Sequence, residues 1–494
     1  MKNKFLILNL FVLFILASCS DDDTKTTQEF VVAFENPSVS LTTEEETKEV
    51  KLVFSRNAAE NGTATITYTT VNAEYDTHFT TNPASEEGTI TVPVTAGSNS
   101  ATFTLNKLQN PIEGTEMSVT FKLASISNPE SSIQGNTSLA VSFTESAALG
   151  GVLSPDWGGS TYPNQVFIDL SSQKMTPIKR DTWELAFYSG SENRVFLNPA
   201  LRVSAAELTQ FTDINAVTSS TVFDPPLVIN SFDLFTQSFK EVTVNSVEEY
   251  KVGVKVSYSM YEPYVDTSTG ELEGTAISEI AVNDEENKVY LVYMGTEIED
   301  TPAEPGKINT GSVDRGWYKI RVTMEGDSYK LKYAPLDATD YSEVLISKTP
   351  QYNSTAFSLT NNKALSVEPA KAEWDLNFSG VFATEIGTTY SDFVLHNTLG
   401  GTGVYEVVIE DGIKSYEDFT MSDVIEDSLV FDKKNIIGSG WRSTTGPSSS
   451  TPVAKNDRYY VLKDPDGNYY KIRFTALLSE SGERGYPKFE YNLL

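Results

Sequence analysis

The chain has 494 residues, a formal net charge of −31, two histidines and a single cysteine, Cys19. A negative field of this size repels phosphate backbones, which excludes nucleic acid as a partner. These few histidines and one cysteine cannot build a disulfide, a three-histidine zinc site or a Ser-His-Asp or Cys-His catalytic constellation. No carboxylate pair stands out among the 68 acidic residues, so we expect no enzyme and no metal site.

The N-terminus has the pattern of an export signal. Two lysines precede an apolar run, residues 5–17, that is too short to span a membrane as a permanent helix. The run ends in LASC, residues 16–19, which resembles the lipobox of bacterial lipoproteins. That resemblance implies that residues 1–18 are a signal peptide and that Cys19 receives the lipid, which would be the membrane anchor.

Acidic residues follow the cysteine directly. The triplet Asp21–Asp23 resembles the surface-export signal of Bacteroidetes lipoproteins, and residues 19–28 read equally well as a solvated acidic tether. We therefore expect an outer-membrane lipoprotein that faces the cell exterior, with a periplasm-facing lipoprotein as the alternative.

The rest of the chain favours an all-β fold, because Tyr, Phe, Thr and Val are abundant and no long 3.6-residue periodicity is present. Length alone suggests about three domain-sized units. Between residues 29 and 145, alternating segments at 63–71, 88–94, 100–108, 117–126 and 138–145 are separated by Gly, Asn, Pro and Ser. This spacing predicts a β-sandwich, and the order of its segments resembles Calx-β and related immunoglobulin-like modules.

Two interpretations of this first module stay open. Some Calx-β domains bind calcium through clustered carboxylates, and Glu74 and Asp76 lie where such ligands would be. The stretch EYDTHF lacks the dense acidic cluster that a hard cation needs, which favours a spacer role.

Residues 146–165 are rich in Gly, Ser and Pro and are predicted to be a linker. The following region, 166–494, contains a weak internal repeat, in which WELAF (183–187) is echoed by WDLNF (374–378). Strand alternation would place Trp, Leu and Phe of each copy on one face. We therefore predict an antiparallel β domain of two lobes.

The tail of each copy also repeats. The segment NKVYLVY…GWYKIRVT (287–323) is echoed by NDRYYVLKDPDGNYYKIRFT (456–475). In the second copy DPDG is typical of a tight hairpin turn, whereas the first copy has a long acidic loop, 294–315.

Five segments in this region resemble the HmuY family of Bacteroidetes surface lipoproteins: WELAFYSGSENRVFLNPAL, EWDLNFSG, GSGWRSTTGP, DRYYVLKDPDGNYYKIRFTAL and the terminal GYPKFEYNLL. The resemblance covers roughly residues 160–494. It implies a surface protein that binds haem or a related porphyrin and passes it to a TonB-dependent receptor. The family's haem iron is held between two axial side chains, histidines in some members and methionines in others.

The ligand positions of the family are not kept. Thr445 stands where a ligand histidine would precede Gly-Pro, and the other ligand region, 406–423, has Met421 as its one soft donor. His396, in SDFVLHNTLGGTG, lies further upstream, at the predicted end of a strand that runs into a Gly-Gly turn. His396 and Met421 are the haem-ligand candidates, although a core role is the simpler interpretation of Met421.

A second function stays open beside haem. Tyrosines crowd the stretches 257–266 and 457–474, and exposed rings stack on sugars as well as on porphyrins, although rings in strands more often pack in a core. The alternative is therefore a HmuY-fold lipoprotein without haem that binds a glycan, a peptide or a partner protein.

Overall fold

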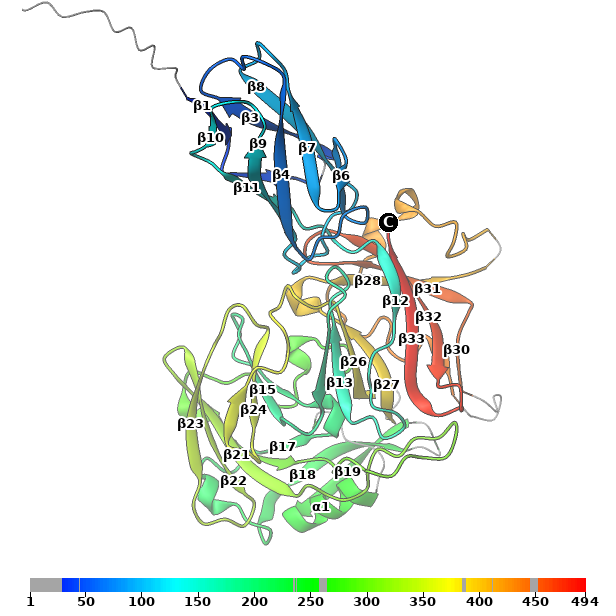
Figure 1. The fold of residues 1–494 in the computed structure, drawn as a ribbon. Coiled ribbons are helices and arrows are strands. Elements are labelled where there is room, and N and C mark those ends of the chain that lie inside the picture. The colour runs from blue at the N-terminus through cyan, green and yellow to red at the C-terminus, as the bar shows by residue number, and fades with distance from the viewer. Residues whose placement is uncertain are drawn as a thin grey trace, which may run out of the picture. The chain divides into compact units, whose positions relative to one another are not determined.

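The computed structural model describes residues 29–43, 45–233, 236, 238–256, 264–383, 388–410, 412–444 and 452–494. The chain forms two compact units, divided after Glu145, with the short piece Ile112–Gly114 belonging to the second. Both units are built from mostly antiparallel sheets, with parallel pairs β1–β10 and β2–β11 in the N-terminal unit, which confirms the predicted all-β class (Figure 1). Cys19, the signal peptide and the tether lie outside the described residues.

The N-terminal unit is a sandwich of two sheets around one core, as the spacing of alternating segments predicted. One sheet has the order β10-β1-β3-β8-β5, with β1 (Phe30–Phe34), β3 (Thr47–Phe54), β5 (Phe79–Asn82), β8 (Ser100–Lys107) and β10 (Ser131–Ile133). The other has the order β2-β11-β9-β4-β7-β6, with β2 (Ser38–Leu41), β4 (Gly62–Val71), β6 (Ser85–Glu86), β7 (Thr89–Val94), β9 (Ser118–Ile126) and β11 (Ser138–Phe143).

The C-terminal unit contains two five-stranded and two four-stranded sheets. The first five-stranded sheet has the order β17-β20-β21-β22-β23, with β17 (Ser204–Leu208), β20 (Val289–Tyr293), β21 (Trp317–Glu325), β22 (Ser328–Pro335) and β23 (Ser342–Ser347). The second has the order β28-β31-β32-β33-β12, with β12 (Gly150–Leu153), β28 (Gly403–Val408), β31 (Arg458–Lys463), β32 (Tyr469–Leu478) and β33 (Arg484–Leu493).

Two further sheets of this unit have four strands each. One has the order β16-β15-β24-β25, with β15 (Leu185–Tyr188), β16 (Val195–Leu197), β24 (Ser354–Ser358) and β25 (Lys363–Leu365). The other has the order β27-β26-β13-β14, with β13 (Asn164–Ile168), β14 (Met175–Lys179), β26 (Leu376–Ala383) and β27 (Thr388–His396). We call β15–β25 the inner lobe, and β26–β33 together with β12–β14 the outer lobe.

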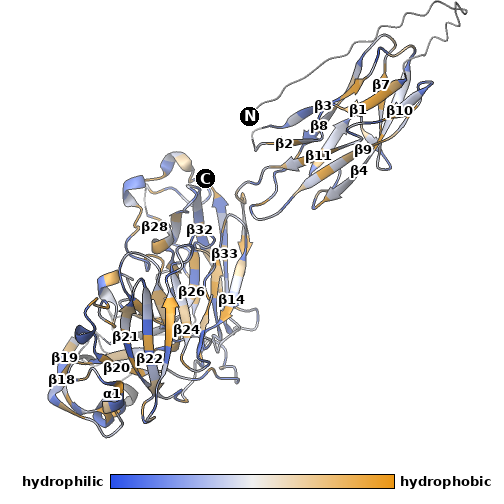
Figure 2. Ribbon diagram, turned by 90° about the vertical axis from the view of Figure 1, so that its left-hand side faces the viewer, coloured by the Kyte–Doolittle hydropathy of each residue, from blue (hydrophilic) through white to orange (hydrophobic). Residues whose placement is uncertain are grey.

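Each lobe packs one five-stranded and one four-stranded sheet around a core of its own. Figure 2 shows the hydrophobic colour of β24, whose Phe357 is fully buried in the inner core. The remaining strands are the pairs β18 (Val222–Asp233) with β19 (Ser238–Ser246) and β29 (Arg442–Ser443) with β30 (Val453–Ala454). The helical segments are α1 (Val247–Val256), η1 (Pro199–Leu201), η2 (Ile214–Ala216), η3 (Leu272–Gly274), η4 (Asp284–Glu286), η5 (Thr398–Gly400), η6 (Met421–Asp423) and η7 (Glu426–Ser428).

The prediction that residues 146–165 form a linker is wrong, because this segment belongs to the outer lobe. Strand β12 pairs with β33 in the register Gly150↔Asn492 to Leu153↔Phe489. Trp157 is fully buried and stacks against Trp441 in the outer core, with ring centroids 6.5 Å apart. Small residues and prolines in this stretch made it resemble a linker although its few large side chains are buried.

The two predicted tails have the expected form. Asp464–Gly467 turns the chain between β31 and β32, and the N–H of Gly467 donates to the carbonyl of Asp464. In the inner lobe β20 and β21 pair in the same way, but the long acidic loop connects them, closed by an isolated bridge between Thr296 and Asp314.

Candidate functional site

A cavity of about 150 Å³ lies between the four-stranded sheets of the two lobes. Strands β15, β16 and β24 supply wall residues from the inner lobe, and β13, β26 and β27 supply them from the outer lobe. Further wall residues lie outside these strands, among them residues 265–267, Gly270 and Lys434. Its aromatic members are Phe167, Trp183, Phe196, Trp374 and Phe382. Because both lobes contribute strands, the site exists only when they pack together.

The tryptophans of the two sequence repeats meet at this cavity. Trp183 and Trp374 belong to one apolar cluster, which also includes Phe167 and Ala356. The ring of Phe167 lies edge-on to Trp374, with centroids 5.1 Å apart. The repeat visible in the sequence is therefore the origin of the paired aromatic walls.

The predicted common face of Trp, Leu and Phe is wrong. Strand β15 begins at Leu185, and Leu185 and Phe187 lie in the core of the inner lobe. Trp183 precedes the strand and is packed with Ala186 in the cavity cluster instead. The strict two-residue alternation holds only inside the strand, and the residue two positions before Leu185 lies outside it.

Asn397 fixes the outer-lobe corner of the cavity. Its Nδ2 donates to the carbonyls of Lys371 and Trp374, 2.8 and 2.9 Å away. Its Oδ1 accepts from the backbone N–H of Gly400 at 2.9 Å and from Nδ2 of Asn353 at 2.8 Å. This side chain is 1% exposed, so each bond is shielded from water.

Asn198 repeats the arrangement in the inner lobe. Its Nδ2 donates to the carbonyls of Arg180 and Trp183, 2.7 and 2.8 Å away. Its Oδ1 accepts from the backbone N–H of Ala200 at 3.0 Å and from Nε2 of Gln165 at 2.9 Å. In both lobes the asparagine side chain bonds to the carbonyl of the tryptophan, to the carbonyl of the residue three positions before that tryptophan, and to a side chain of the opposite lobe.

A buried carboxylate follows each tryptophan. Glu184 accepts from the backbone N–H of Leu359 at 2.7 Å and forms an ion pair with Arg315 at 2.5 Å. Asp375 accepts from the backbone N–H of Leu170 at 2.9 Å, and burial raises its pKa well above the ordinary value. These carboxylates clamp the strands that carry the walls.

His396 is a wall residue and is 1% exposed. Its Nε2 lies 3.2 Å from the carbonyl of Val430, which can only accept, so Nε2 carries the proton. Burial lowers the pKa of His396 to about 4, so the ring is neutral and its Nδ1 is an acceptor. As predicted, β27 ends at His396, and the turn after it has Gly401 at φ 103°.

The cavity wall carries two carboxylates and two cations. Asp266 accepts from two backbone N–H groups at 2.8 and 2.9 Å, and burial raises its pKa to about 6. Burial lowers the pKa of Lys434, an effect that the carboxylate of Asp266 opposes. Glu368 accepts from Ser354, and burial raises its pKa to about 7. Together with Arg202 these side chains sum to a formal charge of zero.

Several wall residues carry a buried nitrogen or oxygen that has no hydrogen-bond partner within the described part of the chain. The atoms are Gln165 Oε1, Thr267 Oγ1, Asn377 Oδ1, His396 Nδ1, Trp183 Nε1, Trp374 Nε1 and Arg202 Nε. A buried polar group without a partner costs about 1–3 kcal/mol. Because several of them lie around one cavity, the wall is suited to a bound molecule that supplies the missing partners.

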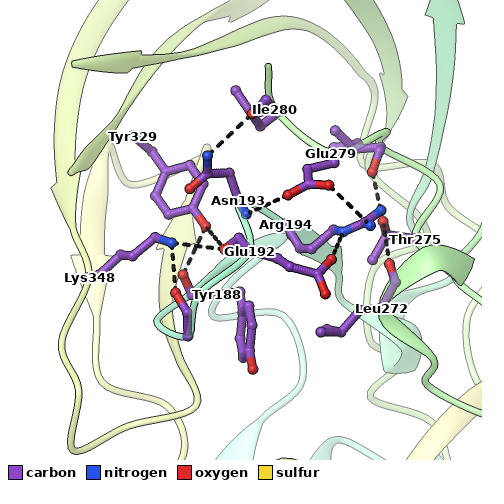
Figure 3. A network of polar contacts seen from close by, with 12 residues as sticks. Tyr188, Glu192, Asn193, Arg194, Leu272, Thr275, Glu279, Ile280, Tyr329 and Lys348 are labelled. Atoms are coloured by element: carbon purple, nitrogen blue, oxygen red, sulfur yellow. Dashed lines mark hydrogen bonds and ion pairs between the residues drawn. The ribbon is translucent and has the colours of Figure 1, made fainter. Parts of the chain in front are cut away.

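A polar network holds the hairpin turn between β15 and β16, which places Phe196 on the wall (Figure 3). Lys348 Nζ donates to the carbonyls of Gly190 and Glu192, 2.7 and 2.8 Å away. Arg194 pairs with Glu192 at 2.7 Å and with Glu279 at 3.4 Å. The turn is therefore held by groups of its own lobe and does not depend on a ligand.

Comparison with known protein families identifies the family of this chain. The model of the HmuY protein family matches residues 161–491. The chain belongs to the HmuY family. The match begins within the outer lobe and includes all of the inner lobe, so both lobes are parts of one HmuY region. Among curated proteins, no sequence matches this chain.

Solved structures give weaker likenesses. The apo-form Calx CBD1 domain has 11% identity and a TM-score of 0.21, covering 24% of this chain and 98% of its own. CBD12 from CALX1.2 has 10% identity and a TM-score of 0.20, covering 55% of this chain and 82% of its own. A two-domain protein of unknown function from Bacteroides fragilis has 10% identity and a TM-score of 0.20, covering 46% and 84%.

The HmuY resemblance implied haem, and the described candidate ligands do not fit it. Met421 is 44% exposed, lies in η6 and lines a separate surface depression, whereas His396 lines the cavity. The two candidates are therefore not brought together as an axial pair. The core role expected for Met421 is also wrong, because η6 lies in an exposed loop. Thr445 lies outside the described residues.

The described residues contain no group of three or more His, Cys, Asp or Glu that could hold a metal ion. In the N-terminal unit the backbone N–H of Glu74 donates to Nδ1 of His78 at 3.0 Å, and Asp76 has φ 67°. The two calcium-ligand candidates therefore lie in a local turn. Within the same described ranges, no helix is long and apolar enough to cross a membrane.

Sequence reasoning found His396 but missed its neighbours in the wall. Gln165, Asp266, Glu368 and Lys434 come from four distant parts of the chain, and nothing in their local sequence marks them. The repeat offered one usable signal. An asparagine directly follows the second strand after each repeated tryptophan, at 198 and at 397.

Proposed function

We propose that this HmuY-family protein is a surface lipoprotein that binds a small molecule, not haem, in the cavity between its lobes. Lipidation at Cys19 anchors it to the outer membrane, and the ligand passes to a TonB-dependent receptor, as the family resemblance implies. The observation that carries the proposal is the set of unpaired polar atoms in an aromatic-walled cavity that both lobes build.

The size of the cavity supports a small ligand. An apolar protein cavity of roughly 150 Å³ holds one benzene ring. The cavity between the lobes has about this volume, whereas haem carries four pyrrole rings in one rigid plane. This volume matches the size of a single-ring molecule and is smaller than a porphyrin requires.

The chemistry of the wall supports a ligand as well. Binding sites combine apolar and aromatic walls with a few convergent polar groups. The cavity has this composition, and its tryptophans are held by the asparagine corners before any ligand arrives. Pre-organised walls of this kind lose little entropy on binding.

Two measurements test the proposal on the purified full-length chain. In the first, hemin is titrated at micromolar concentration, and we expect no shift of the Soret band. A Soret shift that is lost in His396→Ala or Met421→Ala would establish haem binding and overturn the proposal.

In the second, a library of single-ring compounds is screened by thermal shift. Ala356 lies in the wall and is 4% exposed, so Ala356→Phe fills the cavity. We expect hits with the native chain that disappear in this variant. Ala364→Phe, on the neighbouring strand β25 and exposed, is the matched control and should keep them. Hits that survive Ala356→Phe would place the ligand elsewhere.

A further inference from the structure

The charge, polarity and shape of the cavity restrict the class of its ligand, an inference that rests on the proposed function. The wall's two carboxylates and two cations cancel formally. Asp266 and Lys434 interact electrostatically with each other, Glu368 is bound to Ser354, and Arg202, whose Nε has no partner among the described residues, balances the formal charge of Glu368, so the wall as a whole carries no net formal charge. A charged ligand would also lose its hydration in a wall whose net formal charge does not favour either sign. The ligand is therefore neutral.

The unpaired wall groups include both donors and acceptors. Gln165 Oε1, Asn377 Oδ1 and His396 Nδ1 can only accept in the arrangement described. The indole Nε1 atoms of Trp183 and Trp374 can only donate. A ligand that satisfies both kinds from one small volume needs groups that donate and accept at once. Hydroxyl groups do so, since each offers one proton and two lone pairs.

The aromatic side chains supply the remaining surface. Phe167 and Trp374 are perpendicular at 81°, and Trp183 belongs to the same cluster, so the walls offer flat apolar faces in more than one orientation. Flat rings cover the C–H faces of a saturated ring, while its hydroxyls point outward to the polar atoms of the wall. A planar heteroaromatic base has fewer polar groups around its edge.

From this combination we propose that the cavity binds one neutral sugar residue. The ring lies against the tryptophan and phenylalanine faces, and its hydroxyls pair with Gln165, Asn377 and His396. Sugar recognition here is the work of both lobes, because Gln165, Asn377 and His396 belong to the outer lobe and Trp183 to the inner lobe.

Isothermal titration calorimetry on the full-length protein tests the inference. The probes are glucose, galactose, mannose and N-acetylglucosamine, with glucuronate as the charged probe and uracil as the neutral heteroaromatic probe. We expect at least one neutral sugar to bind, with at least tenfold weaker binding of glucuronate and uracil.

Two variants locate the site. Asn377→Leu keeps the volume of the side chain and removes its unpaired oxygen, and we expect it to weaken sugar binding at least tenfold. Ala364→Phe, outside the wall, should leave the affinity unchanged. Circular dichroism shows that both variants are folded.

The outcomes separate this inference from the proposed function. If uracil or an apolar ring binds and every sugar fails at 10 mM, the sugar class is overturned while the cavity remains a small-molecule site. If none of the probes binds, the sugar inference is overturned, and the thermal-shift screen decides separately whether the cavity binds another small molecule. Hemin binding would overturn the proposed function first and this inference with it.

Discussion

Replacing Asn397 by alanine removes four hydrogen bonds from a buried corner of the site. The carbonyls of Lys371 and Trp374 then lose this donor, Nδ2 of Asn353 loses this acceptor, and the N–H of Gly400 keeps only the backbone carbonyl of residue 397, at 3.1 Å. Each net hydrogen bond contributes about 1 kcal/mol. Since the side chain is 1% exposed and water does not replace the lost partners, we expect the free energy of unfolding to fall by about 4 kcal/mol.

Urea unfolding followed by tryptophan fluorescence measures this change selectively. All five tryptophans lie between residues 157 and 441, so the signal reports only on the C-terminal unit. Asn198→Ala is the matched variant and should lose a similar amount, because Asn198 makes the equivalent four bonds. Asn215→Ala, at an exposed position, is the control, with an expected change below about 0.5 kcal/mol.

Losses below about 1 kcal/mol in Asn198→Ala and Asn397→Ala would mean that these side chains do not hold the corners. A large loss in one variant and none in the other would refute the equivalence of the two lobes at this position.

Three further predictions concern buried charge. The pKa of His396 falls from 6.5 to about 4 on folding, so the unfolding free energy should drop by up to about 3 kcal/mol as the pH falls from 6.5 to 4, and His396→Gln should remove this dependence in urea titrations. Burial raises the pKa of Glu368 to about 7, so the pH dependence of its contribution to the unfolding free energy is opposite: stability falls as the pH rises. Glu368→Gln should therefore stabilise the protein more at pH 8 than at pH 5. Asp392, 2% exposed, pairs with Arg442 at 2.6 Å and with Arg484, so Asp392→Asn should cost about 3–5 kcal/mol in the same assay.

Much of the fold could be predicted because strand alternation is a local property. The segments at 63–71 and 88–94 coincide with β4 and β7, and the DPDG turn lies between β31 and β32 as expected. The prediction failed where burial depends on distant partners. Trp157 lies in a stretch of small residues and prolines, and only its pairing with segments more than 200 residues away places it in a core.

The candidate site was less predictable for the same reason. His396 stands out in the sequence because histidine is rare here, and it does line the cavity, but as a neutral wall residue. Met421 is the one soft donor in its region, yet it is exposed and lies in a loop. The wall is assembled from both lobes, so no single segment of sequence contains its chemistry.

The pairing of β12 with β33 has a consequence for the history and engineering of the chain. The inner lobe is one continuous stretch, whereas the outer lobe takes β26–β33 from the end of the chain and β12–β14 from before the inner lobe. The N–H of Leu493 donates to the carbonyl of Leu149, so these two positions are adjacent. A circular permutant joined there and opened just before Trp374 would read as two tandem copies of one gene segment, outer lobe first, each folding from its own tryptophan onward.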